Sequence, residues 1–490
     1  MSHENSANKE PLIRYVNRRQ MSWRPVDVER LIEEEHLARA IWALVGRFDL
    51  SAFYASIVSS AVEGGRPAFD PQLRISLWVY AYSQGIGSAR EVARRCEYDP
   101  AFQWLTGLLE VNYHTLADFR VEKQEELDEL FTQVLATLSK EGLITLKQVM
   151  QDGTKIRALA SGRSFQQEET IREHLEGAQQ HVKEMGDEEL SPRVREARQR
   201  ACEQRQQRLE KALEEIQKLQ RQKPSSAKKE NKVSISDPQA RFMKQSDGGL
   251  APSYNVQIST DAAQGMIVAV EVTTEASDSG QLLPALERIE QRFKQKPQQI
   301  VADGGYTTHE VIKQMAERET DFLGNLGRDL KGSGLTAPHQ LPPTAFLYDP
   351  AVNRLRCPEG KWLGSQGRRN RKSGTVYHRY EAKAEDCLPC PRKPQCCPSN
   401  QRRGRSVMRL EESFLVTAFR QKMASVEARQ QYRRRARVAE FCHAWIKCKL
   451  GLRQFHVRGR LKARAEALWA CLTYNLQQWI RLQRTALPAS

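Results

Sequence analysis

Long apolar runs are missing from this 490-residue sequence, and none approaches the length that a membrane span needs. The first twenty residues, MSHENSANKEPLIRYVNRRQ, are polar and contain no apolar core of a secretory signal. We therefore expect a soluble cytosolic protein rather than a membrane or secreted one. The ten cysteines are then expected to be reduced or metal-bound, because disulfides are rare in the cytosol.

Acidic residues are also in short supply relative to basic ones. Lys and Arg number 76 against 60 Asp and Glu, which gives a formal charge of +16. Residues 401–460 contain 16 Lys or Arg against 4 Asp or Glu, so a local excess of twelve positive charges lies in this segment. The concentration indicates a polyanionic partner, with a solvated basic face or tail as the ordinary alternative. A hydrophobic share of 40% excludes wholesale disorder, and the length suggests about three domains.

The first 140 residues are predicted to be helical. Apolar residues recur at helical spacing in residues 28–48, and two more helices are predicted on either side of Gly85-Ile86-Gly87. Basic residues in the turns of this region make DNA binding plausible. A structural or dimerising helix bundle fits the composition equally well.

Strand patterns begin after residue 140. An apolar run that includes Val149 and Met150 leads into Asp152, and residues 253–274 form two β-branched runs joined by a turn. Between them, residues 165–222 repeat apolar positions at 4-3-4-3 spacing, which predicts an antiparallel helical hairpin. The strands are therefore expected to form one domain that a helical hairpin interrupts.

A second acidic residue ends a later strand. An amphipathic helix is predicted to begin near Ser277 or Ser279, and residues 300–302 follow as a short buried strand that runs into Asp303 and two glycines. A helix and a last short strand complete the pattern. The order of strand, hairpin, helix, strand, helix and strand is that of a ribonuclease H-like mixed sheet, so the predicted class is α/β.

Asp152 and Asp303 are the first candidate catalytic residues. If their strands are neighbours, both carboxylates lie at one edge of the sheet, where open α/β sheets keep their ligands. Carboxylate oxygens on rigid strands suit Mg²⁺ or Mn²⁺. The ordinary alternative for Asp303 is the start of a turn or a helix cap.

A third acid is expected on a helix packed against the sheet, and Glu440 is the candidate. Its ordinary alternative role is a surface ion pair, which contributes little. An apolar stripe on the same helix is expected to pack on the sheet, beside a stripe in which Glu440 lies among cations. The first stripe is Val438, Phe441, Trp445 and Cys448, and the second is Arg433, Arg437, Glu440, Ala444 and Lys447.

Several segments together resemble the DDE transposases of bacterial insertion sequences, in particular the IS-eleven-eighty-two-like branch. The helical leading region resembles that branch's N-terminal domain as well. The motifs occur in the family's order over most of the chain. They are DGTKIRA at 152–158, YNVQISTD at 254–261, ADGGYTTHE at 302–310, and a tail that runs from Glu440 through KARAEALWACLTYNL at 462–476.

The resemblance implies an enzyme that cleaves DNA strands at the terminal inverted repeats of an insertion sequence and transfers them to a target. Asp152, Asp303 and Glu440 would be its catalytic acids and would hold two Mg²⁺ or Mn²⁺ ions. The implied partner is double-stranded DNA, both element ends and target, bound by a homodimer in the bacterial cytoplasm at the nucleoid.

The resemblance also assigns DNA-binding residues. The family's signature of tyrosine, arginine, glutamate and lysine matches Tyr432, Arg435, Glu440 and Lys447. Arg437 fits the arginine position equally well, and the cations would grip phosphates beside the cut. His443-Ala444 replaces the usual Phe-Gly pair, which concerns the local packing and not the carboxylate.

A cysteine cluster lies between the last strand and the Glu440 helix. Cys387 and Cys390 form a CxxC knuckle, with Cys357 upstream and Cys396 or Cys397 shortly after. We take Cys357, Cys387, Cys390 and Cys396 as the candidate tetrahedral zinc ligands. Reduced, unliganded cysteines are the alternative, because the spacings are looser than in paired zinc knuckles.

The sequence thus predicts five segments and three function classes. A metal-dependent transposase is the first function, a nuclease or resolvase without strand transfer the second, and an inactive DNA-binding relic the third. The predicted segments are 1–140, helical and DNA-binding; 141–165 with 236–330, the first part of the catalytic core; 166–235, the inserted hairpin and linker; 331–410, the cysteine insertion; and 411–490, the C-terminal helices with the third acid.

Overall fold

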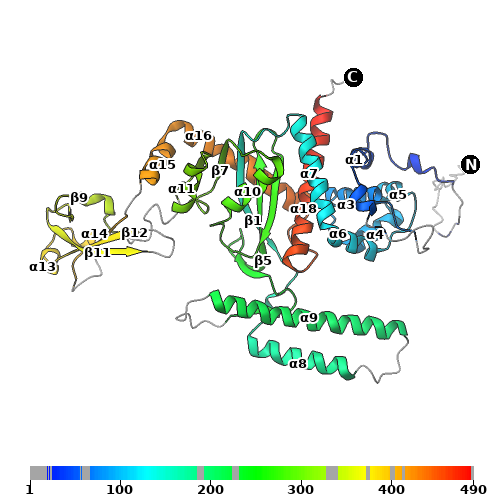
Figure 1. Ribbon diagram of the computed structural model, residues 1–490, viewed down its shortest axis with the longest axis horizontal. Helices are drawn as coiled ribbons and strands as arrows, with labels where there is room; N and C mark the ends of the chain where they lie inside the picture. Colours follow the sequence, from blue (N-terminus) through cyan, green and yellow to red (C-terminus); the bar gives the residue numbers. More distant parts are fainter. Residues whose placement is uncertain are drawn as a thin grey trace, which may run out of the picture.

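The computed structural model has a central sheet with helices on one side and a small β module on the other (Figure 1). A two-helix hairpin lies beside the sheet in the same view. The described residues are 25–55, 67–184, 192–222, 231–326, 340–370, 376–397, 403–410 and 414–486, together with positions 19, 21 and 57.

The N-terminal region is helical. Its central helix, α3 (Pro71–Ser83), is buried along most of its length. At the N-terminus of α3, the Asp70 side chain caps the helix by accepting a hydrogen bond from the Gln72 amide, and Pro71 occupies the first turn. Trp78 and Tyr82 of this helix are fully buried. The helices are α1 (Leu37–Val45), α2 (Ser51–Ala55), α3 (Pro71–Ser83), α4 (Ala89–Tyr98), α5 (Pro100–Thr106), α6 (Tyr113–Glu122) and α7 (Gln124–Lys140).

The central sheet is mixed. Its order is β4-β5-β1-β7-β8, with β6 also paired to β5. β1 is antiparallel to β5 and parallel to β7, and β7 is parallel to β8. The predicted mixed α/β class with a helical N-terminal region is confirmed. The strands are β1 (Gln148–Arg157), β4 (Arg241–Lys244), β5 (Leu250–Asp261), β6 (Ile267–Thr273), β7 (Gln299–Ala302) and β8 (Asp321–Gly324).

Helices cover both faces of the parallel part of the sheet. Ile300 and Ala302 of β7 pack with α10 (Leu282–Phe293) and α11 (His309–Glu317) on one face. Val301 packs on the opposite face, because side chains alternate along a strand. α15 (Phe414–Ala424) also packs on the first face, where Val416 and Phe419 join the same cluster. The second face is covered by α16 (Val426–Arg435) and its continuation, which consists of a π-helical segment at Ala436–Glu440, α17 (Phe441–Ala444) and a second π-helical segment at Trp445–Lys449.

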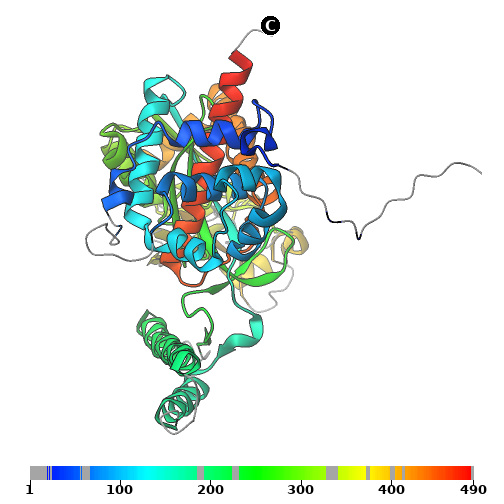
Figure 2. The same cartoon turned by 90° about the vertical axis from the view of Figure 1, so that its right-hand side faces the viewer.

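The long helix α18 (Arg460–Ala486) joins the N-terminal helices to the sheet. It packs against β6 on one side and against α3 and α7 on the other, and Figure 2 shows it running among the N-terminal helices. Asn475 of α18 accepts a hydrogen bond from the Ile267 amide and donates one to the Ile267 carbonyl. The N-terminal helices and the antiparallel part of the sheet therefore share one hydrophobic core.

The helical hairpin consists of α8 (Glu168–Glu184) and α9 (Pro192–Gln222). It leaves and re-enters the sheet domain through two short paired strands, β2 (Phe165–Gln166) and β3 (Val233–Ser234). Its apolar positions form a small core of their own around Ile171, Leu209 and Ile216. The turn at 185–191 and the linker at 223–230 lie outside the described residues.

The cysteine-containing segment forms a second sheet of order β13-β12-β11-β10-β9, which the sequence did not predict. All its pairs are antiparallel, and its own core includes Leu355, Leu363 and Tyr380. The elements are β9 (Leu347–Asp349), β10 (Arg354–Arg356), β11 (Trp362–Asn370), β12 (Val376–Ala382), α13 (Ala384–Cys387), α14 (Lys393–Cys396) and β13 (Ser406–Leu410).

Across the described ranges, no helix combines the length and the apolar character that crossing a membrane requires.

Candidate active site

Asp152 and Asp303 lie on neighbouring parallel strands. The β1–β7 register pairs Gln151 with Ala302, so the next residues along the two strands are the two aspartates. Met150 and Val301, two residues before each, pack in one cluster. Because side chains alternate along a strand, both aspartates are directed toward the face that α16 and its continuation cover.

A turn holds Asp303 at the strand end. Its Oδ1 accepts a hydrogen bond from the Gly305 amide at 2.7 Å. A Cβ at position 305 would lie 2.9 Å from that same oxygen, so glycine is needed for this close approach. The two glycines after the strand therefore let the chain turn tightly around the carboxylate.

Asp152 is buried next to a cation. Arg435 Nη1 lies 2.8 Å from Asp152 Oδ2, and the two side chains are only 16% and 13% exposed. Burial raises the pKa of Asp152 to about 6; the positive charge of Arg435 opposes this shift, and the negative charge of Asp303 adds to it. Asp152 and Asp303 are thus close enough for their charges to interact, and we call the two residues the acidic centre.

Glu440, the predicted third acid, is close to this centre but faces solvent. Its side chain is 62% exposed, and its Oε1 lies 3.8 Å from Arg435 Nη2. His443 lies deeper, with Nδ1 3.9 Å from Asp152 Oδ2. Burial lowers the pKa of His443 to about 4, so this imidazole is neutral at neutral pH. Arg435 therefore lies between Asp152 and Glu440 and pairs with both. His443 lies near Asp152 as a neutral imidazole.

The predicted apolar stripe of this helix is wrong in part. Phe441 is 48% exposed and Cys448 is exposed, whereas the buried side chains are Ala439, Cys442 and Ile446. The reason is that two π-helical segments widen the helix, so the face toward the sheet shifts relative to regular α-helical spacing.

The predicted DNA-binding residues divide into two groups. Arg435 and Tyr432 are partly buried at the site, with the guanidinium of Arg435 5.9 Å from the Tyr432 ring centre. Lys447 is also partly buried, and burial lowers its pKa. Arg437 is exposed on the helix surface. Arg435 is thus the arginine next to Asp152, and Arg437 is not.

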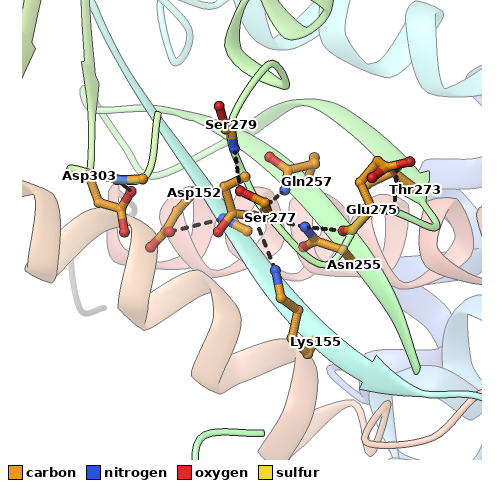
Figure 3. A network of polar contacts seen from close by, with 12 residues as sticks. Asp152, Lys155, Asn255, Gln257, Thr273, Glu275, Ser277, Ser279 and Asp303 are labelled. Carbon is orange, nitrogen blue, oxygen red and sulfur yellow. Dashed lines mark hydrogen bonds and ion pairs between the residues drawn. The ribbon is translucent and has the colours of Figure 1, made fainter. Parts of the chain in front are cut away.

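The sequence reading missed Asp278. We expected a helix from near Ser277 or Ser279, but α10 begins at Leu282, so Asp278 lies in the loop before it. Asp278 Oδ1 accepts hydrogen bonds from Lys155, Asn255 and Gln257. In the view of Figure 3, Asp152 lies between Asp303 and these three residues. Ser277 and Ser279 on either side of it are typical of a helix cap. The sequence pattern therefore did not indicate that Asp278 lies beside β1 and β5.

The acidic centre offers oxygen donors of the kind that divalent cations prefer. Asn255 Oδ1 is buried there without a hydrogen-bond partner among the described residues, and a Cβ at Gly153 would lie 3.0 Å from it. Within the described ranges, however, no three His, Cys, Asp or Glu side chains are close enough together to hold a metal ion. The donor chemistry fits a divalent cation, with Asp152 and Asp303 as the residues that would hold it.

The cysteine cluster is partly assembled in the second sheet. Cys357, Cys387, Cys390 and Cys396 line one small cavity. The Lys361 amide donates to Cys357 Sγ at 3.3 Å and the Arg405 amide to Cys387 Sγ at 3.4 Å. Among the described residues, however, no three of these sulfur atoms are close enough together to bind one metal ion. Zinc binding stays a prediction.

Two family models match separate parts of the chain. Residues 26–122 match the family described as "Transposase domain (DUF772)", and residues 356–480 match "Transposase DDE domain". Both matches support a DDE transposase. Such a domain implies a nucleotidyl-transfer enzyme in general, and DDE domains generally use divalent metals. The second matched range contains Glu440 and Lys447, whereas Asp152 and Asp303 lie between the two ranges.

Comparison with individual proteins adds little. No curated protein matches the chain. Among solved structures, the cryo-EM structure of a piggyBac transposase synaptic complex with hairpin DNA aligns over 94% of this chain and 76% of that chain. The identity is 8% and the TM-score is 0.30.

Proposed function

We propose that this protein is a transposase that cleaves DNA at the terminal inverted repeats of an insertion sequence and joins the ends to a target. The observation that carries the proposal is the register of the parallel strands β1 and β7, which sets Asp152, within β1, beside Asp303, directly after the end of β7. The matches to transposase families support the same reading. We propose further that the protein belongs to the IS-eleven-eighty-two-like branch and acts in the bacterial cytoplasm at the nucleoid.

The strand order supports a ribonuclease H-like catalytic core. In that interpretation, β6, β5 and β1 form the antiparallel half and β7 and β8 the parallel half. Residues 141–165, 236–330 and 411–490 would make up this core, with 1–140 as a DNA-binding helical domain. Residues 166–235 and 331–410 would be insertions into it.

Mg²⁺ or Mn²⁺, as two ions, is the proposed cofactor, held by Asp152 and Asp303 with Glu440 as the third donor. Held by these residues, such ions would supply Lewis-acid chemistry for displacement at phosphorus. Arg435, with Nη1 2.8 Å from Asp152 Oδ2, offsets part of the negative charge of this carboxylate. The protein itself would position the DNA strand and supply positive charge around the phosphate under attack.

Basic residues around the site suit double-stranded DNA as the partner. Arg433, Arg434 and Arg437 are exposed on α16 and its continuation, within the segment that carries the local charge excess. Lys447 and Arg435 would contact phosphates nearer the cut. Such contacts position a duplex without reading its sequence. A homodimer would bring two element ends together.

The test is cleavage and joining of a labelled DNA that carries candidate inverted-repeat ends, with Mg²⁺ and with EDTA. We expect metal-dependent cutting and joined products from the intact protein, and neither from Asp303→Asn. The control is Asp247→Asn. Asp247 is exposed in the turn between β4 and β5, so this variant should cut DNA like the intact protein.

Three other outcomes would contradict the proposal in different ways. Cutting without joined products would favour a nuclease or resolvase. Binding without cutting, with both ends present, would favour a DNA-binding relic. Full activity of Asp303→Asn would remove that residue from the site. The zinc prediction is checked separately by the zinc content of the purified protein and of Cys387→Ser.

A further inference from the structure

Asp278 is held at the site from three directions. Lys155 Nζ lies 3.1 Å from its Oδ1, and the side-chain amides of Asn255 and Gln257 each donate to Oδ1 at 2.8 Å. The Asp278 side chain is 23% exposed. All three donors reach one oxygen, and no donor in the described chain bonds to Oδ2. A carboxylate anchored in this way presents its second oxygen in a fixed direction.

The donors come from β1, the strand that carries Asp152, and from its antiparallel neighbour β5. Lys155 lies three residues along β1 from Asp152, and the β1–β5 register pairs it with Asn255 and pairs Gly153 with Gln257. Gln257 is further fixed by the Tyr306 hydroxyl and by the Gln151 amide, both buried. The position of Asp278 is therefore set by the rigid centre of the sheet rather than by its own loop.

Two glycines bring Asp278 close to the catalytic aspartates. A Cβ at Gly153, directly after Asp152, would overlap Asp278 Oδ1 and the Gln257 amide. A Cβ at Gly305 would lie 2.9 Å from Asp303 Oδ1 and 3.8 Å from Asp278 Cβ. The backbone next to each aspartate therefore packs directly against Asp278, and any larger residue would separate them.

Charge and an unsatisfied polar atom point the same way. The negative charge of Asp278 is among the causes that raise the pKa of Asp152, and it also acts on His443. Asn255 Oδ1, fully buried, has no partner among the described residues and faces Gly153. Arg435 and Lys155 already offset the charges of Asp152 and Asp278, so the unsatisfied group is the buried Asn255 oxygen, which a cation bound nearby would satisfy.

We propose that Asp278 is a further carboxylate of the catalytic centre, which contributes its Oδ2 to the binding of the divalent cation that Asp152 and Asp303 hold. This inference rests on the proposed function, because it concerns the same site. Glu440 is largely exposed on the helix, whereas Asp278 is already anchored at the strand ends. Asp278 would thus provide the acid that is fixed before DNA arrives.

The variant Asp278→Asn tests this assignment with little disturbance. Its carbonyl oxygen can still accept the three hydrogen bonds at the Oδ1 position, and only the second oxygen is replaced by an NH₂ group. Asp278→Ser, smaller and neutral, is the second variant if the amide fails to fold. The control is Asp237→Asn, because Asp237 is also a hydrogen-bonded carboxylate, more deeply buried than Asp278, but it accepts its bonds from Tyr254 and Gly459 and not from the residues that hold Asp278.

The measurement is Mn²⁺ binding to the full chain by electron paramagnetic resonance, with and without DNA. We expect Asp278→Asn and Asp303→Asn each to weaken Mn²⁺ binding by at least about tenfold, and Asp237→Asn to stay within about twofold of the intact protein. Unchanged Mn²⁺ affinity in both Asp278 variants, with loss in Asp303→Asn, would overturn the Asp278 assignment and leave the proposed function standing.

The converse result separates the two proposals. Loss of Mn²⁺ affinity in the Asp278 variants, from a protein that neither cuts nor joins end-bearing DNA, would support the cation site and contradict the transposase function. Absence of saturable Mn²⁺ binding to the intact protein, with and without DNA, would overturn the assignment of Asp278.

Discussion

At the scale of single residues, Asp152 contributes unfavourably to stability while it serves the proposed site. Its pKa of about 6 lies above the ordinary 3.8, so the folded state binds this proton more tightly than the unfolded state does. Stability is therefore lost as pH rises from about 4 to about 6, and the penalty persists above that range. A buried acid kept for function at a cost in stability is a common compromise at active sites.

Asp152→Asn should accordingly raise stability at neutral pH. We expect a gain in the free energy of unfolding at pH 7.5 of up to roughly 3 kcal/mol, reduced by the loss of the Arg435 ion pair, and no gain below about pH 4. Urea unfolding of both proteins at the two pH values measures the difference. A variant less stable than the intact protein at pH 7.5 would contradict the inferred burial penalty.

Arg435 and Arg437 should differ sharply despite their closeness in sequence. Arg435→Ala leaves the Asp152 carboxylate buried without its cation, so we expect a loss of about 1–3 kcal/mol in the free energy of unfolding. Arg437→Ala removes an exposed side chain and should change stability by less than about 0.5 kcal/mol.

The DNA-binding effect of Arg437→Ala should be electrostatic. We expect weaker binding at all sequences and a salt dependence reduced by about one phosphate contact. Fluorescence anisotropy over a range of salt concentrations measures this. Equal stability of the two arginine variants would contradict the distinction that the structure makes between them.

At the scale of elements, local patterns predicted most strands but not how the covering helix faces the sheet. The short apolar runs before Asp152 and Asp303, and the β-branched hairpin at 253–274, correspond to β1, β7, β5 and β6. Their period of two and their turn residues are local signals. The π-helical segments around Glu440 carry no such signal, so the exposed Phe441 and the buried Cys442 could not be predicted.

Asp278 illustrates the same limit in the candidate site. Its role depends on Lys155, Asn255 and Gln257, which lie on two other strands and reach it only through the sheet register. The second sheet was missed for a different reason, since β9 and β10 have only three residues each and β11 is basic rather than alternately apolar. Non-local pairing determines the position of Asp278, and sequence spacing does not report it.

The helical hairpin should be separable from the rest of the fold. Its small core is nearly self-contained, and a partly buried ion pair between Glu215 and Arg241 is one link to β4. We expect replacement of residues 168–222 by a short Gly/Ser linker to lower the free energy of unfolding by no more than about 2 kcal/mol. Chemical denaturation measures this, and failure of the shortened chain to fold would show that the hairpin supports the sheet.

At the scale of the whole molecule, one buried ionic cluster joins the N-terminal helices to α18. Glu466 of α18 is fully buried, accepts hydrogen bonds from the His456 amide and ring, and lies 3.6 Å from Arg120 of α6. Trp469 donates to the Arg120 carbonyl. The N-terminal helices and the C-terminal helix should therefore unfold together.

Glu466→Ala is expected to destabilise the whole molecule. Removing the carboxylate leaves Arg120 buried without its ion-pair partner, which costs about 3–5 kcal/mol. The same change in an exposed pair, Glu196→Ala opposite Arg200, should cost less than about 1 kcal/mol. Thermal unfolding monitored by near-ultraviolet circular dichroism compares them. Similar melting temperatures for the two variants would contradict a shared core.

The place of α18 near the end of the described chain also has a consequence for biosynthesis. The helices of residues 37–140 are made first, yet Trp469 and Trp479, which complete their core, follow only after the sheet has been translated. At about 5–20 residues per second, these helices wait roughly 20–70 seconds on the ribosome for their packing partner. A nascent chain released before α18 is made would lack this part of the core and would leave apolar surface of the N-terminal helices exposed to aggregation.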